Sequence, residues 1–347
     1  MDMNLIISKL IVNVAILFVM MIPGIIIKKM NMIPEGFGKG ISNLVLNIAQ
    51  PCLILFAYLN CDDRDIWADS LVVLLLSFIA HIIFAVVAMC LFRRQPDGKR
   101  RLLRLATVFS NAAFMGIPLI SAIYAGTPLA GRATIYASIY NITFNLFLWS
   151  LGVFICTNGR DDNNDGILDP HIIEKKKTAS PLKALYHPAT VAAVLGIIAL
   201  ALNLKNAVPS VFGETSILND SLDMIRGLVA PLSMVVIGIR LADMNFKGFF
   251  NDAGMYLSLA LRHLILPIAV IGATALLKLA GLPVSEEVFT VTVILAAAPS
   301  ASSATMFAEK FDCDAMYVSR IVAASTVISI LTMPAVLFIG NYIMNAI

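Results

Sequence analysis

Long apolar runs recur along the whole chain, and they restrict what it can fold into more than any other feature. A helix needs about 20 consecutive apolar residues to cross a bilayer. The sequence contains ten such runs, at residues 5–27, 39–59, 69–92, 102–125, 133–157, 186–204, 218–241, 253–278, 287–308 and 316–340. Only 14% of the residues are charged, whereas a soluble domain carries about a quarter. The sequence therefore predicts an all-α polytopic membrane protein with ten transmembrane helices.

The first apolar run and the cysteines further restrict what kind of membrane protein this is. Run 5–27 has neither a basic cluster before it nor a small-residue cleavage site after it, so we expect a retained span and not a signal peptide. The five cysteines are scattered without a CxxC pair, which gives no sign of a disulfide framework or a zinc site. We expect no metal, no cofactor and no nucleic-acid partner.

The distribution of basic residues predicts the orientation. When the loops are assigned alternately to two sides, one side holds 18 Lys and Arg residues and the other holds three. The three are Arg64, Arg132 and Lys205. Basic loops stay in the cytoplasm, so we expect a cell-membrane protein whose two termini both face the extracytoplasmic side.

Proline spacing suggests an internal repeat. Pro51 and Pro118 are 67 residues apart, and Pro231 and Pro299 are 68 apart. With five runs on each side of the polar segment 158–185, the second copy must insert upside down, as in many transporters. The expected organisation is a first five-helix repeat at 1–157, a cytoplasmic linker at 158–185 and a second repeat at 186–347.

Two corresponding runs carry helix-breaking residues. Pro118 lacks an N–H, Gly116 tolerates unusual backbone angles, and the Asn111 amide can satisfy freed backbone groups. We expect Pro118 to restart a second half-helix, and Pro299 to do the same in "AAAPSASSATMFAEK". Free N–H groups at two such helix starts would form an anion site without any lysine. Hydroxyls are expected there from Ser302, Ser303 and Thr305.

The motifs resemble a known family. "SNAAFMGIPL" at 110–119 and "APSASSATMFAEKFDCDAMYVSRIVAASTVISILTMP" at 298–334 resemble the auxin efflux carrier family, and "LVLNIAQPCLIL" at 44–55 is similar to its second span. Many family members have glycine at Ala113 and asparagine at Ser303. The short segment between the two halves is typical of microbial members.

The resemblance implies a function and a mechanism. It implies two inverted five-helix repeats in which broken helices 4 and 9 cross, with a scaffold of helices 1, 2, 6 and 7. Helices 3–5 and 8–10 would form a transport domain that moves like an elevator, and the protein would be a homodimer. The substrates would be small organic anions such as malate, malonate or an auxin-like acid, and the family's binding asparagine falls on Asn111.

Other polar residues inside the runs are candidates for binding or coupling, because ionisable groups in a membrane are costly. His81 is a candidate proton carrier, or a neutral side chain bonded to the backbone. Arg262 lies 181 residues later and is a candidate partner of an anion, or a side chain that reaches to the interface. Asn141 and Asn145 share one helix face and either bridge helices or reach the substrate.

Three alternatives to an organic-anion carrier remain open at this stage. A membrane sensor of the same fold would normally carry a soluble signalling domain, and the sequence has none that we recognise. An intramembrane enzyme would need motifs such as HExxH or GxSxG, which are missing. A cation-coupled, bile-acid-like symporter is disfavoured because no carboxylate lies at either break, and we interpret Glu309, at the inner end of the second segment, as a helix-end charge that faces water. Proton coupling stays possible, and we expect no enzymatic activity.

Overall fold

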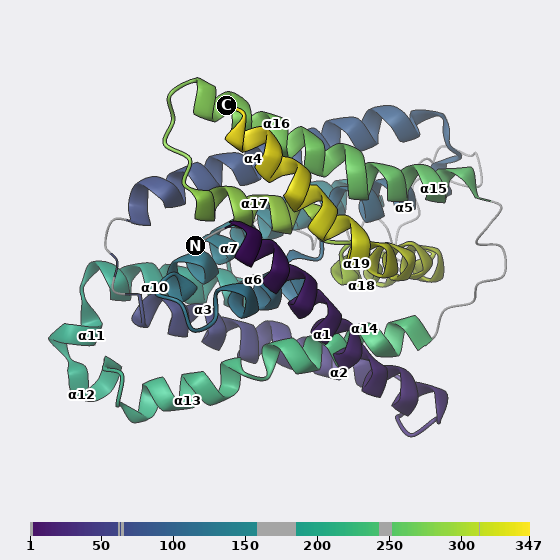
Figure 1. The fold of residues 1–347 in the computed structure, drawn as a ribbon. Helices are drawn as coiled ribbons and strands as arrows, with labels where there is room; N and C mark the ends of the chain where they lie inside the picture. The colour runs from purple at the N-terminus through teal and green to yellow at the C-terminus, as the bar shows by residue number, and fades with distance from the viewer. Residues whose placement is uncertain (1–2, 62, 64–65, 158–184, 243–251, 312) are drawn as a thin grey trace.

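The computed structural model describes residues 3–61, 63, 66–157, 185–242, 252–311 and 313–347 (Figure 1). Within these ranges every regular element is a helix. One isolated antiparallel bridge joins Ser110 to Ser300. The fold class predicted from the apolar runs, an all-α bundle, is therefore confirmed for the described part of the chain. The predicted linker at 158–185 lies almost wholly outside these residues.

Seven helices in the described ranges are long and apolar enough to cross a bilayer. They are Leu5–Lys29, Phe37–Leu59, Ile66–Arg94, Ala130–Thr157, Pro209–Ala242, Ala253–Leu279 and Ala315–Asn345. Each coincides with one of the ten predicted runs. Of the other three runs, 186–204 forms the shorter helix α10, Pro188–Ala201, and 102–125 and 287–308 are each divided into two helices.

One group of helices packs around α1 and α3 (Figure 1). Its members are α1 (Met3–Lys29), α2 (Phe37–Leu44), α3 (Gln50–Leu59), α10, α13 (Ile217–Arg226) and α14 (Val229–Ala242). The short helices α11 (Leu204–Ala207) and α12 (Pro209–Phe212) connect α10 to α13. Glycines bring α1 and α14 close together, because a Cβ on Gly238 would overlap the carbonyl oxygen of Met21. Such small residues permit close helix packing in membranes.

The second group contains the divided runs and the helices around them (Figure 1). Its members are α4 (Ile66–Leu91), α5 (Asp97–Val108), α6 (Ile117–Tyr124), α7 (Ala130–Phe147), α8 (Val153–Thr157), α15 (Ala253–Ala260), α16 (Leu266–Leu279), α17 (Glu286–Ala297), α18 (Ser302–Lys310) and α19 (Ala315–Asn345). Residues 288–297 of α17 are all buried. This helix therefore lies at the centre of the second group.

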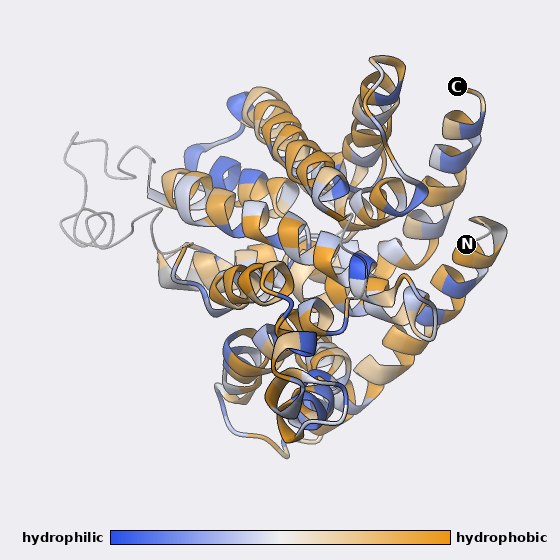
Figure 2. Cartoon of the chain, turned by 90° about the vertical axis from the view of Figure 1, so that its left-hand side faces the viewer, coloured by the Kyte–Doolittle hydropathy of each residue, from blue (hydrophilic) through white to orange (hydrophobic). Residues whose placement is uncertain are grey.

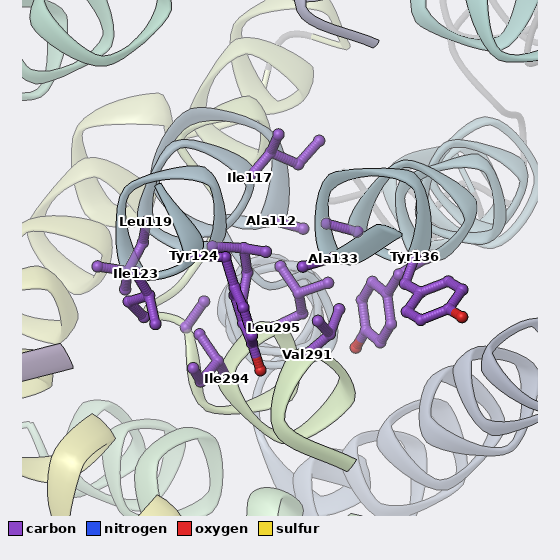
Figure 3. Close-up of a cluster of buried hydrophobic side chains, with 14 of the residues drawn as sticks. Ala112, Ile117, Leu119, Ile123, Tyr124, Ala133, Tyr136, Val291, Ile294 and Leu295 are labelled. Atoms are coloured by element: carbon purple, nitrogen blue, oxygen red, sulfur yellow. The ribbon is translucent and has the colours of Figure 1, made fainter. Parts of the chain in front are cut away.

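Hydrophobic side chains occupy both the interior and the outer surface. Ile117, Ile123 and Leu295 belong to a buried cluster between α6, α7 and α17 (Figure 3). Figure 2 shows hydrophobic residues on the outward faces of the helices as well, and Leu71 and Leu331 are 67% and 79% exposed. Large exposed apolar surfaces of this kind are rare on soluble monomers and indicate contact with lipid.

Candidate functional site

The first divided run breaks at residues 109–111. Helix α5 ends at Val108, and Phe109 has the extended angles φ −94° and ψ 119°. The chain resumes as a π-helical turn at Ala112–Gly116, which continues into α6. The predicted restart at Pro118 is therefore wrong, because the helical backbone resumes six residues earlier, at Ala112. A π-helical turn directly before Pro118 widens the backbone there, so the proline ring is accommodated within a continuing helix.

Gly116 has a different role from the one expected. Its angles, φ −65° and ψ −55°, are helical, so it does not supply the unusual backbone of a break. A Cβ at this position would overlap the side chain of Leu295 in α17. A larger residue here would force the Leu295 side chain to move, so glycine favours close packing of the resumed helix on α17.

The second divided run breaks at residues 298–301. Helix α17 ends at Ala297, Ala298 has φ −56° and ψ 147°, and α18 begins at Ser302. Residues that precede proline avoid the helical region, which explains why Ala298 is extended and the helix ends at Ala297. The expected restart at Pro299 is also wrong, because Pro299 lies inside the extended piece and the helix resumes three residues later.

The two breaks cross and pair through their backbones. The Asn111 N–H donates to the Pro299 carbonyl at 2.7 Å, and the Ala301 N–H donates to the Phe109 carbonyl at 2.8 Å. These bonds bracket the bridge between Ser110 and Ser300. Extended backbone inside a bilayer must be satisfied by protein, and here each break supplies partners for the other.

Arg262 lies beside this crossing and is fully buried. Its guanidinium donates hydrogen bonds to four carbonyl groups at the ends of α5 and α17. These are Thr107 at 3.1 Å, Val108 at 3.4 Å, Ala298 at 3.1 Å and Ala296. The last carbonyls of a helix lack intrahelical partners and carry a partial negative charge. The side chain therefore stabilises two helix ends, and it neither reaches the interface nor lines the cavities described below.

His81 is buried among aromatic rings. Its Nδ1 is 2.7 Å from the Ser77 carbonyl oxygen, and because a carbonyl only accepts, Nδ1 carries the proton. The ring centroids of Tyr140 and Phe147 lie 5.3 and 5.1 Å from the imidazole. These contacts match the backbone-bonded alternative for His81, and whether it carries a coupled proton stays a prediction.

His263, which sequence reasoning passed over, is linked to the crossing. Its Nε2 lies 2.8 Å from Ser325 Oγ, which accepts a hydrogen bond from the Ser300 N–H at 2.8 Å. On the other side of the ring, Nδ1 lies 2.9 Å from Thr332 Oγ1. The sequence did contain a signal for this residue, because His263 directly follows Arg262 inside the apolar run at 253–278.

A cavity of about 530 Å³ lies next to the crossing. Asn141, Asn145 and Ser303 line it, together with Ala113 just after the first break. Aromatic and apolar side chains form much of the wall, namely Leu46, Phe114, Phe144, Leu148, Trp149, Met306 and Phe307. The predicted site residues Asn111, Gly116, Pro118, Pro299, Ser302 and Thr305 do not line this cavity.

Several polar atoms around the crossing are buried without a hydrogen-bond partner in the part of the chain that the structure describes. They are Asn111 Nδ2, Asn141 Oδ1, Asn145 Nδ2, Ser302 Oγ and Thr305 Oγ1. Leaving such an atom unpaired costs about 1–3 kcal/mol. A group of them beside one cavity is therefore typical of a ligand site, and two of the asparagines also line the cavity.

The cavity also contains polar residues that the sequence analysis did not select. Lys39, Asn43 and Asn47 from the α2 segment and His187 before α10 complete its lining. Asn43 and Asn47 are four residues apart and therefore share a helix face. Asn47 belongs to the motif at 44–55 and Asn43 directly precedes that motif, which was the available signal. Among the described residues, no group of three or more His, Cys, Asp or Glu side chains is arranged to hold a metal ion.

An apolar helical bundle with two crossed breaks beside a polar cavity defines the class of multi-pass membrane transport proteins. A family model described as membrane transport protein matches residues 9–337, and the chain belongs to this family of auxin efflux carrier-type transporters. It is 26% identical over 319 residues to an uncharacterized transporter of Methanothermobacter thermautotrophicus. That match covers 91% of this chain and 93% of the relative. The resemblance stated from the motifs is confirmed, and the family is one of transporters and not of enzymes.

Proposed function

We propose that this protein is a secondary transporter of a small organic anion, and that the carboxylate binds in the cavity beside the crossed breaks. The observation that carries the proposal is the coincidence of three features at one place. Two helices restart there, at Ala112 and Ser302, the cavity lies beside them, and Asn145, whose amide nitrogen is buried without a partner among the described residues, lines it. Helix starts and amide N–H groups are the donors that a carboxylate accepts from.

The lining favours one class of anion. Trp149, Phe307 and Phe114 contribute apolar surface, while the polar lining is mostly amide. A carboxylate attached to a flat apolar body would bury its ring against these side chains and direct its charge to Asn141 and Asn145. An auxin-like acid therefore fits this lining better than malate or malonate, which have no apolar body to cover these rings.

The proposed mechanism is alternating access by an elevator movement. In this proposal ten spans form two inverted repeats, at 1–157 and 186–347. The scaffold is built from predicted helices 1, 2, 6 and 7, which correspond to the first helix group, and the transport domain is built from helices 3–5 and 8–10. Lys39 lies at the end of the cavity that belongs to α2. Because the basic loops are expected in the cytoplasm, the cavity would open inward in this conformation, with both termini outside.

The coupling mode is part of the proposal. In the described part of the chain, no Asp or Glu side chain lines the cavity, which supports proton coupling or facilitated transport over sodium coupling. The histidine candidates are His81 and His263, and only the latter is hydrogen-bonded to the crossing. We propose a cell-membrane homodimer, as the family resemblance implies.

Uptake into proteoliposomes tests the proposal. Labelled indole acetate and labelled malate are supplied with and without a pH gradient, and saturable uptake of indole acetate is expected to exceed that of malate. Asn145→Ala should reduce uptake at least tenfold. Asn13→Ala is the matched control, because Asn13 bonds to the Lys9 carbonyl within α1 at 2.8 Å and does not line the cavity. Equal loss in both variants, or no saturable uptake of any organic anion, would contradict the proposal.

A further inference from the structure

A second cavity of about 490 Å³ lies on the other side of α18. Among the residues that the structure describes, four basic side chains line it, Lys28, Lys39, Arg240 and Arg320, and no acidic side chain does. All four belong to the side of the bundle on which the basic loops gather. A concave site lined by cations raises the local concentration of anions, so its chemistry is that of an anion-binding site.

The cavity lies between the two groups of helices. Lys28 is in the last turn of α1 and Arg240 is in the last turn of α14, whereas Arg320 belongs to α19. The Arg240 Nη1 donates to the Ser302 carbonyl at 2.8 Å, where α18 begins. An anion held here would therefore connect the α1–α14 pair to the start of the resumed helix.

Apolar side chains surround the basic cavity. Phe37 and Met316 line it and are 40% and 62% exposed, and Met32, close by in sequence to both Lys28 and Phe37, is 65% exposed. A free inorganic anion gains nothing from such neighbours. An anionic lipid gains from both features, because its headgroup contacts cations while its acyl chains cover apolar surface.

We propose that this cavity binds the phosphate headgroup of an anionic phospholipid, and that the bound lipid stabilises the observed arrangement of the two helix groups. Basic pockets between transmembrane helices on the cytoplasmic side are suited to phosphate headgroups. The site is distinct from the cavity proposed for the transported anion. The two cavities share only Lys39 and Met306, so they lie on either side of α18.

Thermal unfolding of the full-length protein in nanodiscs tests the assignment. The discs contain phosphatidylcholine with an increasing fraction of phosphatidylglycerol, and the midpoint is expected to rise with that fraction. Arg320→Gln and Lys28→Gln should each lose at least half of the rise. Arg320→Lys should retain it, which excludes a simple folding defect. Lys278→Gln is the control, because Lys278 bonds to the Met344 carbonyl at 3.1 Å and does not line this cavity.

A parallel arm separates the two sources of phosphate. Inorganic phosphate is added to pure phosphatidylcholine discs at an ionic strength matched with chloride, and no comparable rise is expected. Native mass spectrometry should also count fewer bound phosphatidylglycerol molecules on Arg320→Gln than on the wild type. An equal rise with inorganic phosphate alone, or equal rises for wild type, Arg320→Gln and Lys28→Gln, would overturn the lipid assignment.

Discussion

Replacing Arg262 distinguishes a structural role from a substrate-binding role. In Arg262→Met the four carbonyl groups that the guanidinium contacts lose a charged donor. A hydrogen bond to a charged group contributes about 1.5–3 kcal/mol, so the gross loss is on the order of 10 kcal/mol. Removing a buried cation also recovers several kcal/mol of desolvation cost. The expected net destabilisation is about 3–5 kcal/mol.

The assay is thermal unfolding of purified protein, followed with a thiol-reactive dye. For a chain of 347 residues, a change of that size corresponds to a lowering of the unfolding midpoint by about 4–7 °C. Arg262→Lys should lower the unfolding midpoint about half as much as Arg262→Met, because an ammonium keeps the charge but cannot contact all four carbonyls. Arg226→Met is the control, because Arg226 pairs with Asp223 at an exposed position, where ion pairs contribute less than about 1 kcal/mol.

The reasoning is refuted if Arg262→Met unfolds at the wild-type temperature and instead abolishes binding of the organic anion. That result would restore the sequence-based interpretation of Arg262 as the partner of the substrate. Loss of stability together with weakened binding in Arg262→Met, with partial recovery of both in Arg262→Lys, is the expected outcome. It would show that the arginine acts on the substrate only through the crossed helix ends.

Three further predictions concern packing, binding and pH. Gly238→Ala should destabilise the protein by about 1–3 kcal/mol, because the new methyl group overlaps a backbone carbonyl of α1. Gly272→Ala, where the space is open, should leave the melting temperature unchanged or raise it slightly. Asn145→Ala should weaken indole acetate binding about tenfold or more in a fluorescence or radioligand titration while the melting temperature is retained, and unchanged affinity would contradict the site. Asp252 stabilises the protein in its ionised form. Burial raises the pKa of its carboxyl, but the hydrogen bond and ion pair with Lys99 at 2.7 Å outweigh burial and hold that pKa below its usual value. This contribution is present above the unfolded pKa of about 3.9 and is lost as the pH falls through the lower folded value. Asp252→Asn should therefore be less stable than wild type at pH 7, and the difference should shrink in melts at pH 3; a pH-independent difference would contradict the pairing.

The membrane class and the approximate places of the breaks could be predicted from the sequence. Apolar runs are local in the chain, and a bilayer admits few alternatives to a helix. The restart positions could not be predicted. Proline marks where a helix loses a bond, but at Pro118 a π-helical turn accommodates the ring, and at Pro299 the preceding residue ends the helix earlier.

The partners of buried polar groups also escaped prediction, because they come from distant parts of the chain. Nothing near Arg262 in the sequence indicates that it contacts carbonyls at Thr107 and Ala296. Similarly, Lys39 and His187 join Asn145 only through the packing of α2, α7 and the start of α10. The sequence indicated the chemistry of the site, whereas the lining of the cavity depends on which helices pack together.

The most direct test of the central claim is an experimental structure of the protein with bound indole acetate. We predict that the carboxylate lies within hydrogen-bonding distance of Asn141 or Asn145, beside the helix starts at Ala112 and Ser302, with the ring against Trp149 or Phe307. A carboxylate bound elsewhere, with no contact to either helix start or to these asparagines, would contradict the account.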